Sequence, residues 1–270
     1  MVHYQGSLKL GILLCLGLFS LACQPVEEPK ATAVNEDTVD ISQYPVLLQK
    51  AWDAHGGLDK WQRMSSLSFS LYQDDQVVDQ HVVDLESRSV FISSDTYRIG
   101  YDGQDVWHSG LSENNLPAGS ARFYHNLHFY FLAMPFVLAD EGLKYDTLGQ
   151  REIQGKFYEG VRITFEDNIG DAPDDEYRVY FDPDTHQMTW LLYTVTYFSA
   201  EESEKFSARL YRDWQWVNGL LLPLTCEKYN WTGTSADTLK YTQQYLDVIV
   251  DALPADQSMF LPPAGALLSD

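Results

Sequence analysis

Residues 121–138 read ARFYHNLHFYFLAMPFVL, and this run decides how the rest of the chain is interpreted. Pro135 limits a helix near the end of the run, because proline lacks a backbone N–H and clashes with the preceding turn. The run is too short, and too often interrupted by polar residues, to span a bilayer. Its apolar residues recur at helical spacing and form one wide stripe: Phe123, Leu127, Tyr130, Phe131 and Met134.

The chain on both sides of this run has the two-residue period of half-buried β-strands. Serines alternate with apolar residues over 66–71, for example. Asp102-Gly103 and Asn218-Gly219 are hairpin signals, and strand spacing of this kind is typical of an all-β sandwich or barrel. Strands are expected over residues 66–71, 76–84, 88–93, 97–101, 104–108, 143–148, 152–154, 157–165, 176–181, 188–198, 206–217, 220–231 and 239–249, with a surface tail from residue 254.

An apolar helix inside a β-rich sequence must be covered by the sheet or cover it. We therefore expect a mainly β (α+β) fold, a single large antiparallel, half-open β-barrel with the aromatic helix as a central plug. A second, amphipathic helix is expected over residues 43–55, with Ser42 as its N-cap and Gly56-Gly57 at its end. Trp52 on that helix joins the five stripe residues as expected lining of a ligand cavity.

The N-terminus resembles a bacterial lipoprotein signal. Residues 10–22 are an apolar segment of signal length, and Cys23 follows Ser20-Leu21-Ala22. The expected organisation is a signal peptide over 1–22, a lipid anchor at Cys23 with a flexible tether over 23–42, and a folded domain over 43–270. An ordinary cleaved secretory signal is the alternative.

Charge and cysteine content narrow the classes of function. The formal charge of -21 and the pI near 4.5 argue against nucleic acid and against adsorption to anionic membrane surfaces. Cys15 is lost if the signal is cleaved, so Cys226 becomes the single free thiol beside the lipidated Cys23. No internal disulfide is then possible, and Cys226, in a strand-like run, is expected to be buried filler.

Two clusters offer metal ligands, each with a simpler interpretation. His125 and His128 share a helix face and are expected to be polar anchors at the helix edge, with metal chelation as the alternative. Asp167, Asp171 and Asp174 lie in an acidic run that lacks EF-hand spacing, so a solvated acidic loop is expected, with a calcium site as the alternative. No cofactor is expected.

No motif supports catalysis. GxSxG, HExxH, CxxC and phosphate-loop patterns are all absent from the sequence. His55 beside the glycine pair is interpreted as a helix-end residue rather than a catalytic base.

Several motifs occur together in an order that resembles the LolA/LolB-like superfamily of periplasmic lipoprotein carriers. They are the lipoprotein signal, the N-terminal amphipathic helix, a YDGQDVW hairpin (101–107), the aromatic helix and an FDPDT turn (181–185). More closely, the chain resembles an uncharacterised family of Gram-negative envelope lipoproteins, through HGG (55–57) with Trp61 downstream, FYFLAMPF (129–136) and VYFDPDT (179–185). The resemblance implies a half-open barrel that holds acyl chains, lipid-anchored in the envelope at the outer membrane and facing the periplasm or the surface. LolA-type carriers also use an inward-facing arginine to hold a closed lid, and no motif places that residue here.

The expected function is therefore binding of an apolar ligand, lipid or lipoprotein acyl chains, as a carrier or receptor. The alternative is a packed interaction or structural module of the envelope without a ligand. No sequence motif supports an enzymatic function.

Overall fold

The computed structural model describes residues 40–167, 170–199 and 204–269. The expected signal peptide, Cys23 and most of the tether lie outside these residues. The described residues form one compact unit. Within the described residues, no helix has the length and apolar character needed to cross a membrane.

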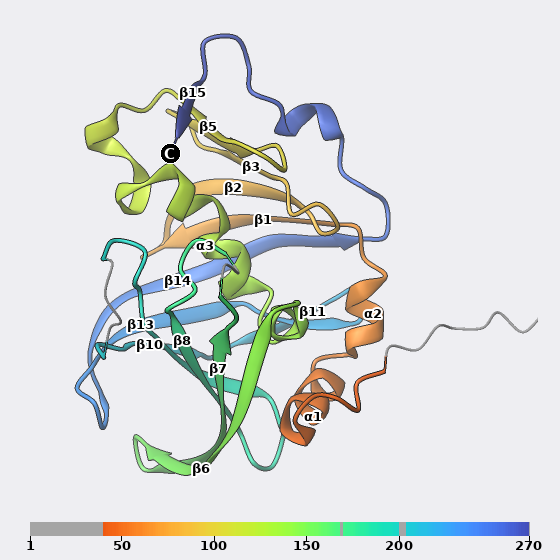
Figure 1. The fold of residues 1–270 in the computed structure, drawn as a ribbon, viewed down its shortest axis with the longest axis vertical. Coiled ribbons are helices and arrows are strands. Elements are labelled where there is room, and N and C mark those ends of the chain that lie inside the picture. Colours follow the sequence, from red (N-terminus) through yellow and green to blue (C-terminus); the bar gives the residue numbers. More distant parts are fainter. Residues whose placement is uncertain (1–39, 168–169, 200–203, 270) are drawn as a thin grey trace, which may run out of the picture. The chain divides into compact units, whose positions relative to one another are not determined.

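Thirteen strands of the described chain form one antiparallel sheet in the order β15-β5-β4-β3-β2-β1-β14-β13-β10-β9-β8-β7-β6. The two end strands, β15 and β6, do not pair with each other, so the sheet curves without closing, as Figure 1 shows. This confirms the expected half-open barrel. The strands are β1 (Ser66–Gln73), β2 (Gln76–Asp84), β3 (Val90–Ser93), β4 (Arg98–Tyr101), β5 (Val106–Ser109), β6 (Leu143–Ile153), β7 (Lys156–Phe165), β8 (Glu176–Phe181), β9 (Met188–Tyr193), β10 (Ser207–Tyr211), β13 (Thr225–Trp231), β14 (Ala236–Asp251) and β15 (Leu267–Ser269).

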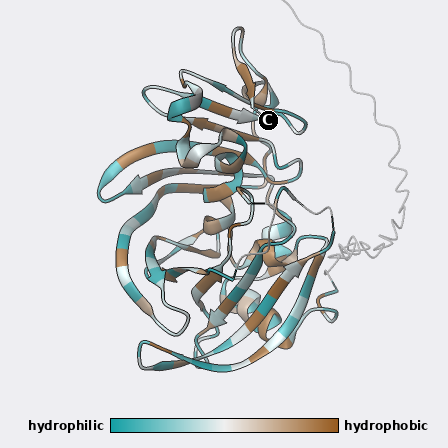
Figure 2. Ribbon diagram, turned by 60° about the vertical axis from the view of Figure 1, so that its left-hand side comes forward, coloured by the Kyte–Doolittle hydropathy of each residue, from teal (hydrophilic) through white to brown (hydrophobic). Residues whose placement is uncertain are grey.

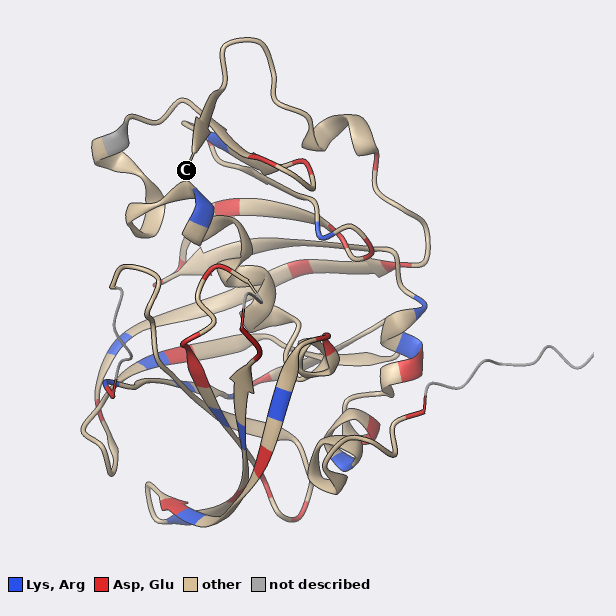
Figure 3. Cartoon of the chain, in the orientation of Figure 1, with Lys and Arg blue, Asp and Glu red and all other residues tan. Residues whose placement is uncertain are grey.

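Irregular pairing bends the sheet. The register shifts between Ser68 and Ser70 against β14, and between Leu148 and Arg151 in the β6–β7 pair. An extra residue on one strand bends it and increases the local twist, which lets a wide sheet coil. Hydrophobic and hydrophilic residues intermingle along the strands in Figure 2, and acidic residues are spread over many elements in Figure 3.

Helix α3 (Ala121–Leu132) is the predicted plug, and it lies within the curve of the sheet (Figure 1). Ser120 caps it, since its side chain accepts from the Phe123 N–H at 3.2 Å. The helix stops before the cis Met134–Pro135 bond, which confirms that proline limits it. The rest of the run forms a short 3-10 turn, η3 (Phe136–Ala139).

The N-terminal helix is shorter than expected. α1 (Val46–Ala54) begins after Pro45, so the expected N-cap at Ser42 is wrong. The reason is that a residue before proline is kept out of the helical region, and Pro45 pre-sets the helical φ. At the other end, a Cβ on Gly56 would lie 2.3 Å from the Gly219 carbonyl oxygen, so the close approach there requires glycine. α2 (Leu58–Gln62) follows.

Two expected strands are each split. The segments 206–217 and 220–231 become β10 with β11 (Trp214–Val217), and β12 (Leu220–Pro223) with β13. The Asn218-Gly219 hairpin is confirmed, but β11 and β12 form a separate two-stranded sheet. The amides of Leu224 and Thr225 both bond the Asp213 carbonyl, which turns the chain out of the main sheet.

The C-terminal tail is more ordered than expected. β15 is exposed but pairs with β5, a pairing that the predicted surface tail did not include. Trp107 Nε1 donates to the Phe260 carbonyl at 2.7 Å, and Phe260, in η4 (Gln257–Phe260), is buried. These contacts attach the tail, because the exposed N–H and C=O groups of an edge strand favour pairing.

Candidate functional site

A cavity of about 580 Å³ lies between α3, η3 and the strands β7 to β9, and we call it the α3 cavity. Most of the residues predicted to line a ligand site stand on its wall. Phe123, Leu127 and Tyr130 are half-buried there, whereas Phe131 and Met134 are almost fully buried. The structure thus brings together five of the six predicted residues: Phe123, Leu127, Tyr130, Phe131 and Met134.

Trp52 is not on this wall, and its placement there is corrected. The indole is buried in the core, where Nε1 donates to the Pro135 carbonyl at 3.0 Å. The Tyr44 ring packs edge-on against it at 4.9 Å. Trp52 therefore anchors the chain that leaves α3, and the burial of its whole ring explains why it cannot also face the cavity.

The sequence reasoning missed the opposite wall. Tyr101, Phe165, Tyr177, Tyr193 and Tyr197 all face the cavity from strands or the loop after β9. Several of these rings pair with others across or along the wall, at distances typical of aromatic contacts: Phe131–Tyr193 at 5.4 Å, Phe123–Tyr197 at 5.2 Å and Phe165–Tyr177 at 5.3 Å. The sequence shows that these aromatic residues alternate along strands, but it does not show which face of each strand turns toward the helix.

Two ion pairs stand on the cavity wall. The Arg122 guanidinium binds both oxygens of Asp171, at 3.0 and 2.8 Å. Arg88 Nη2 lies 2.7 Å from Asp140 Oδ1. Burial raises the pKa of Asp140, although the charge of Arg88 opposes this shift. Asp171, a partly exposed residue of the acidic loop, is thus held by an arginine.

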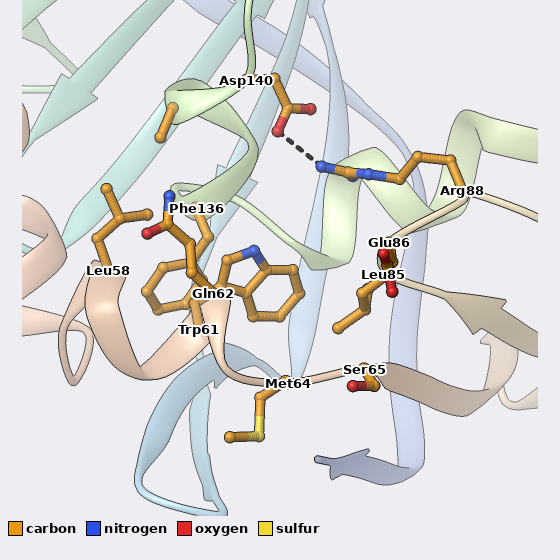
Figure 4. A pocket seen from close by; sticks show the side chains of 11 residues that line it. Leu58, Trp61, Gln62, Met64, Ser65, Leu85, Glu86, Arg88, Phe136 and Asp140 are labelled. Carbon is orange, nitrogen blue, oxygen red and sulfur yellow. Dashed lines mark hydrogen bonds and ion pairs between the residues drawn. The ribbon is translucent and has the colours of Figure 1, made fainter. Parts of the chain in front are cut away.

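A smaller cavity of about 270 Å³ adjoins the Arg88–Asp140 pair. Figure 4 shows the pair beside Trp61 and Phe136, whose rings stack at 5.0 Å. Arg88 and Asp140 line both cavities. The ion pair therefore stands at the boundary between the small cavity and the α3 cavity.

A buried polar network holds the other side of α3. The Asp79 carboxylate on β2 accepts from His81 Nε2 at 2.7 Å, Tyr97 Oη at 2.6 Å and Tyr124 Oη at 2.7 Å. Burial alone would raise the pKa of Asp79, but His81 and the two tyrosine hydrogen bonds lower it to about 2. Because Tyr124 belongs to α3, this network ties the helix to the sheet.

Both helix histidines are buried, and burial favours the neutral form of each ring. Burial lowers the pKa of His125 to about 4, and its Nδ1 donates to the Arg122 carbonyl. His128 is buried against His81, with ring centroids 5.9 Å apart, and burial holds its pKa well below the usual value. Among the described residues no group of three or more His, Cys, Asp or Glu is arranged to hold a metal, and Asp167, Asp171 and Asp174 form none.

His55 is a structural tie, as interpreted from the sequence. Its Nδ1 donates to the Leu221 carbonyl at 2.9 Å, and its Nε2 accepts from the Met188 N–H at 3.1 Å. Burial lowers its pKa to about 4, which suits a neutral ring with one donor and one acceptor nitrogen. Cys226 is free and buried, as expected, and Arg209 Nη1 lies 3.8 Å from its Sγ.

A family model described as a family of unknown function (DUF6503) matches residues 100–213. That segment contains the motifs at 101–107, 129–136 and 179–185, while the HGG motif lies before it. The comparison with curated proteins found no match.

Among solved structures, the chain is similar to a DUF1329 family protein from Desulfovibrio piger, with 12% identity, 79% of this chain and 97% of that chain covered, and a TM-score of 0.44. It is similar to a LolA superfamily protein from Nitrosomonas europaea at 11% identity, with 80% and 96% covered and a TM-score of 0.45. A putative outer membrane lipoprotein-sorting protein domain from Vibrio parahaemolyticus has 10% identity, 76% and 97% covered, and a TM-score of 0.38. The open antiparallel sheet around α3 has the form of the half-open barrel that the sequence predicted.

Proposed function

We propose that this domain binds an apolar ligand, the acyl chains of a lipid or lipoprotein, in the α3 cavity. The observation that carries the proposal is the cavity itself, about 580 Å³ in volume and walled by aromatic and aliphatic side chains of α3 and the facing strands. Small-molecule sites typically enclose roughly 300–1,000 Å³ and have mainly apolar walls with a few polar groups. Apolar burial of about 25 cal/mol per Å² then supplies the binding free energy.

The proposal places the domain in the envelope of a Gram-negative bacterium as a carrier or receptor. The signal-like residues 10–22 and Cys23 support a lipid anchor, and the polar residues 24–42 support a tether. The folded domain over 43–270 then works next to the outer membrane, where acyl chains are available. The function is binding, without a catalytic step or a cofactor.

The packed envelope module is the second candidate function. One observation favours it: Phe131 and Met134, although on the cavity wall, are only 5% and 1% exposed. The side of α3 with Tyr124 is also clamped by hydrogen bonds to the Asp79 network. A rigid helix of this kind is equally suited to presenting a fixed outer surface to a partner.

Mass spectrometry of organic extracts separates the two functions. A Cys23→Ser chain has no acyl group at residue 23, so a lipid present in stoichiometric amount after purification is expected to come from the cavity. The matched control is Cys23→Ser with Leu127→Trp, which fills the cavity and is expected to lose the lipid. A clean extract, together with no uptake of a fluorescent fatty acid, supports the packed module instead.

A further inference from the structure

Two cations lie on the inner face of the sheet behind the α3 cavity. Arg209 on β10 is directly opposite Lys228 on β13 in the strand register. No carboxylate of the described residues forms an ion pair with either side chain. A buried charge without a counter-charge is costly unless something neutralises it or it is well hydrogen-bonded.

Arg209 is 1% exposed and permanently charged. Its Nη1 donates to Gln243 Oε1 at 2.7 Å and its Nη2 to Tyr241 Oη at 3.2 Å, while its Nε has no partner among the described residues. The guanidinium carbon lies 3.7 Å from the centroid of the Phe131 ring. These neutral partners orient the charge but leave it uncompensated.

Lys228 lies beside it and is half-buried. Its Nζ donates to Tyr193 Oη at 2.7 Å and stands 4.5 Å from the centroid of the same ring. Burial, followed by the charge of Arg209, lowers the pKa of Lys228 to about 7. Because the Tyr193 oxygen accepts this bond, its own hydroxyl proton is available to an anion.

Both cations stand directly behind the cavity wall. Phe131 covers Arg209 and Tyr193 covers Lys228, and both rings line the α3 cavity. An anion that reaches the Tyr193 hydroxyl therefore meets two positive charges in a site of low dielectric constant.

The carboxylates of the same wall do not cancel this charge. Asp140 and Asp171 are already paired with arginines. Glu141 is exposed, and Asp175 Oδ1 already accepts hydrogen bonds from the Thr196 N–H at 2.7 Å and the Thr194 hydroxyl at 3.3 Å. The positive charge of the inner face thus remains available to a ligand.

We propose that the ligand of the α3 cavity is an anionic amphiphile, whose carboxylate or phosphate head accepts a hydrogen bond from the Tyr193 hydroxyl, in the field of the Lys228 and Arg209 charges behind it. Its acyl chain lies along the apolar wall formed by α3. This inference rests on the proposed function and names the class of ligand for that site. Beside Lys228, the groups that face its ammonium are Arg209 on β10, Tyr193 on β9, Tyr241 on β14 and the buried thiol of Cys226 on its own strand.

The test measures the affinities of probes that share one chain length, in the Cys23→Ser chain. Hexadecanoate and hexadecyl phosphate are compared with neutral hexadecanol by displacement of a fluorescent fatty acid at pH 6.5. An anionic probe is expected to bind about tenfold more tightly than the alcohol, as one hydrogen bond to a charged group allows. Whichever anion is preferred tells whether the head is a fatty-acid carboxylate or a phosphate ester.

The second arm removes the charge. Lys228→Met keeps the apolar stem and is expected to abolish most of the preference for the anion while leaving hexadecanol affinity unchanged. The matched control is Lys240→Met, an exposed lysine next to Tyr241 on β14, which is expected to keep the preference. Raising the pH from 6.5 to 9 is expected to weaken binding of hexadecanoate in the Cys23→Ser chain, because Lys228 loses its proton, and not in Lys228→Met.

Three results decide between the claims. Equal affinity for the anions and the alcohol overturns this inference and leaves the proposed function standing. A preference that persists in Lys228→Met overturns the assignment of Lys228. Failure of every probe to bind overturns the proposed function itself.

Discussion

Different interactions dominate on the two sides of α3, hydrogen bonds on one and apolar contacts on the other. The sheet side carries Tyr124, which donates a hydrogen bond to Asp79, and the buried His128. The cavity side carries Phe123, Leu127 and Tyr130, which remain half-buried. Hydrogen bonds hold the helix on one side, so its apolar side does not have to be completely packed for the helix to stay in place. The buried hydrogen bond from Tyr124 to Asp79 thus allows an open apolar cavity on the other side of the helix.

The largest expected effect comes from breaking the sheet side. Asp79→Ala leaves the donors of His81, Tyr97 and Tyr124 buried without their acceptor. We expect a loss of about 3–5 kcal/mol in the free energy of unfolding, measured by urea denaturation. Tyr97→Phe, which removes one donor and leaves the carboxylate two others, is the milder control. A loss below about 1 kcal/mol for Asp79→Ala would mean that the network does not hold the helix.

Phe131 lies between the two sides of α3, so its substitution tests whether the cavity side is fully packed. Its ring packs on Arg209 and Tyr193 but also lines the cavity. We expect Phe131→Ala to cost about 2 kcal/mol, less than the usual penalty for a core phenylalanine, because part of the ring has no contacts to lose. Ligand retention should fall more than stability does.

The matched control for this change is Phe181→Ala, since Phe181 is fully buried in the core. That variant should cost about 3–5 kcal/mol in urea denaturation and leave lipid uptake in the folded fraction unchanged. Equal losses for the two variants, with unaltered uptake in both, would favour the packed module.

Low pH is expected to destabilise the fold through Asp79, on the sheet side of α3. The folded pKa of Asp79, about 2, is depressed below the ordinary aspartate value of 3.8. Its contribution is therefore fully present above about pH 4 and lost as the pH falls through 2. The expected loss is about 2 kcal/mol, followed as the urea midpoint between pH 5 and pH 2. Asp79→Ala should remove this part of the acid dependence, and an unchanged acid profile in that variant would contradict the assignment.

Calcium should have the smallest effect, on the cavity side. Both oxygens of Asp171 are engaged by Arg122, so the loop offers calcium few free ligands. Millimolar calcium is expected to leave Tm within about a degree of its value in chelator. A rise of several degrees, by linkage, would show specific binding to the folded chain and refute the prediction.

Local chemistry explains which expectations were accurate. Hairpin dipeptides, alternation and Pro135 act over a few residues, and they correctly located most strands, the hairpin at Asn218-Gly219 and the end of α3. The start of α1 was predicted too early. Pro45 sets it through a local effect on the residue before it. The tail strand β15 was missed because its pairing with β5 is set by chain segments far apart in sequence.

The candidate site divides in the same way. The helical period of residues 121–138 was sufficient to predict the apolar stripe of α3, five of whose residues line the cavity. It was not sufficient to place Trp52, because an apolar helix face shows that a ring is buried but not what it is buried against. Nor did it identify the facing tyrosines or the Asp79 network.

By itself, then, the sequence determined the class of fold, the aromatic helix and its end, because these depend on residue period and backbone sterics within short windows. The curvature of the sheet decided the rest. It brought Asp79 of β2 onto Tyr124, and it placed Arg209 and Lys228, from two strands, behind the rings of Phe131 and Tyr193. The α3 cavity and the two charges behind it form where segments far apart in sequence come together, and only the tertiary structure determines the distances between those segments.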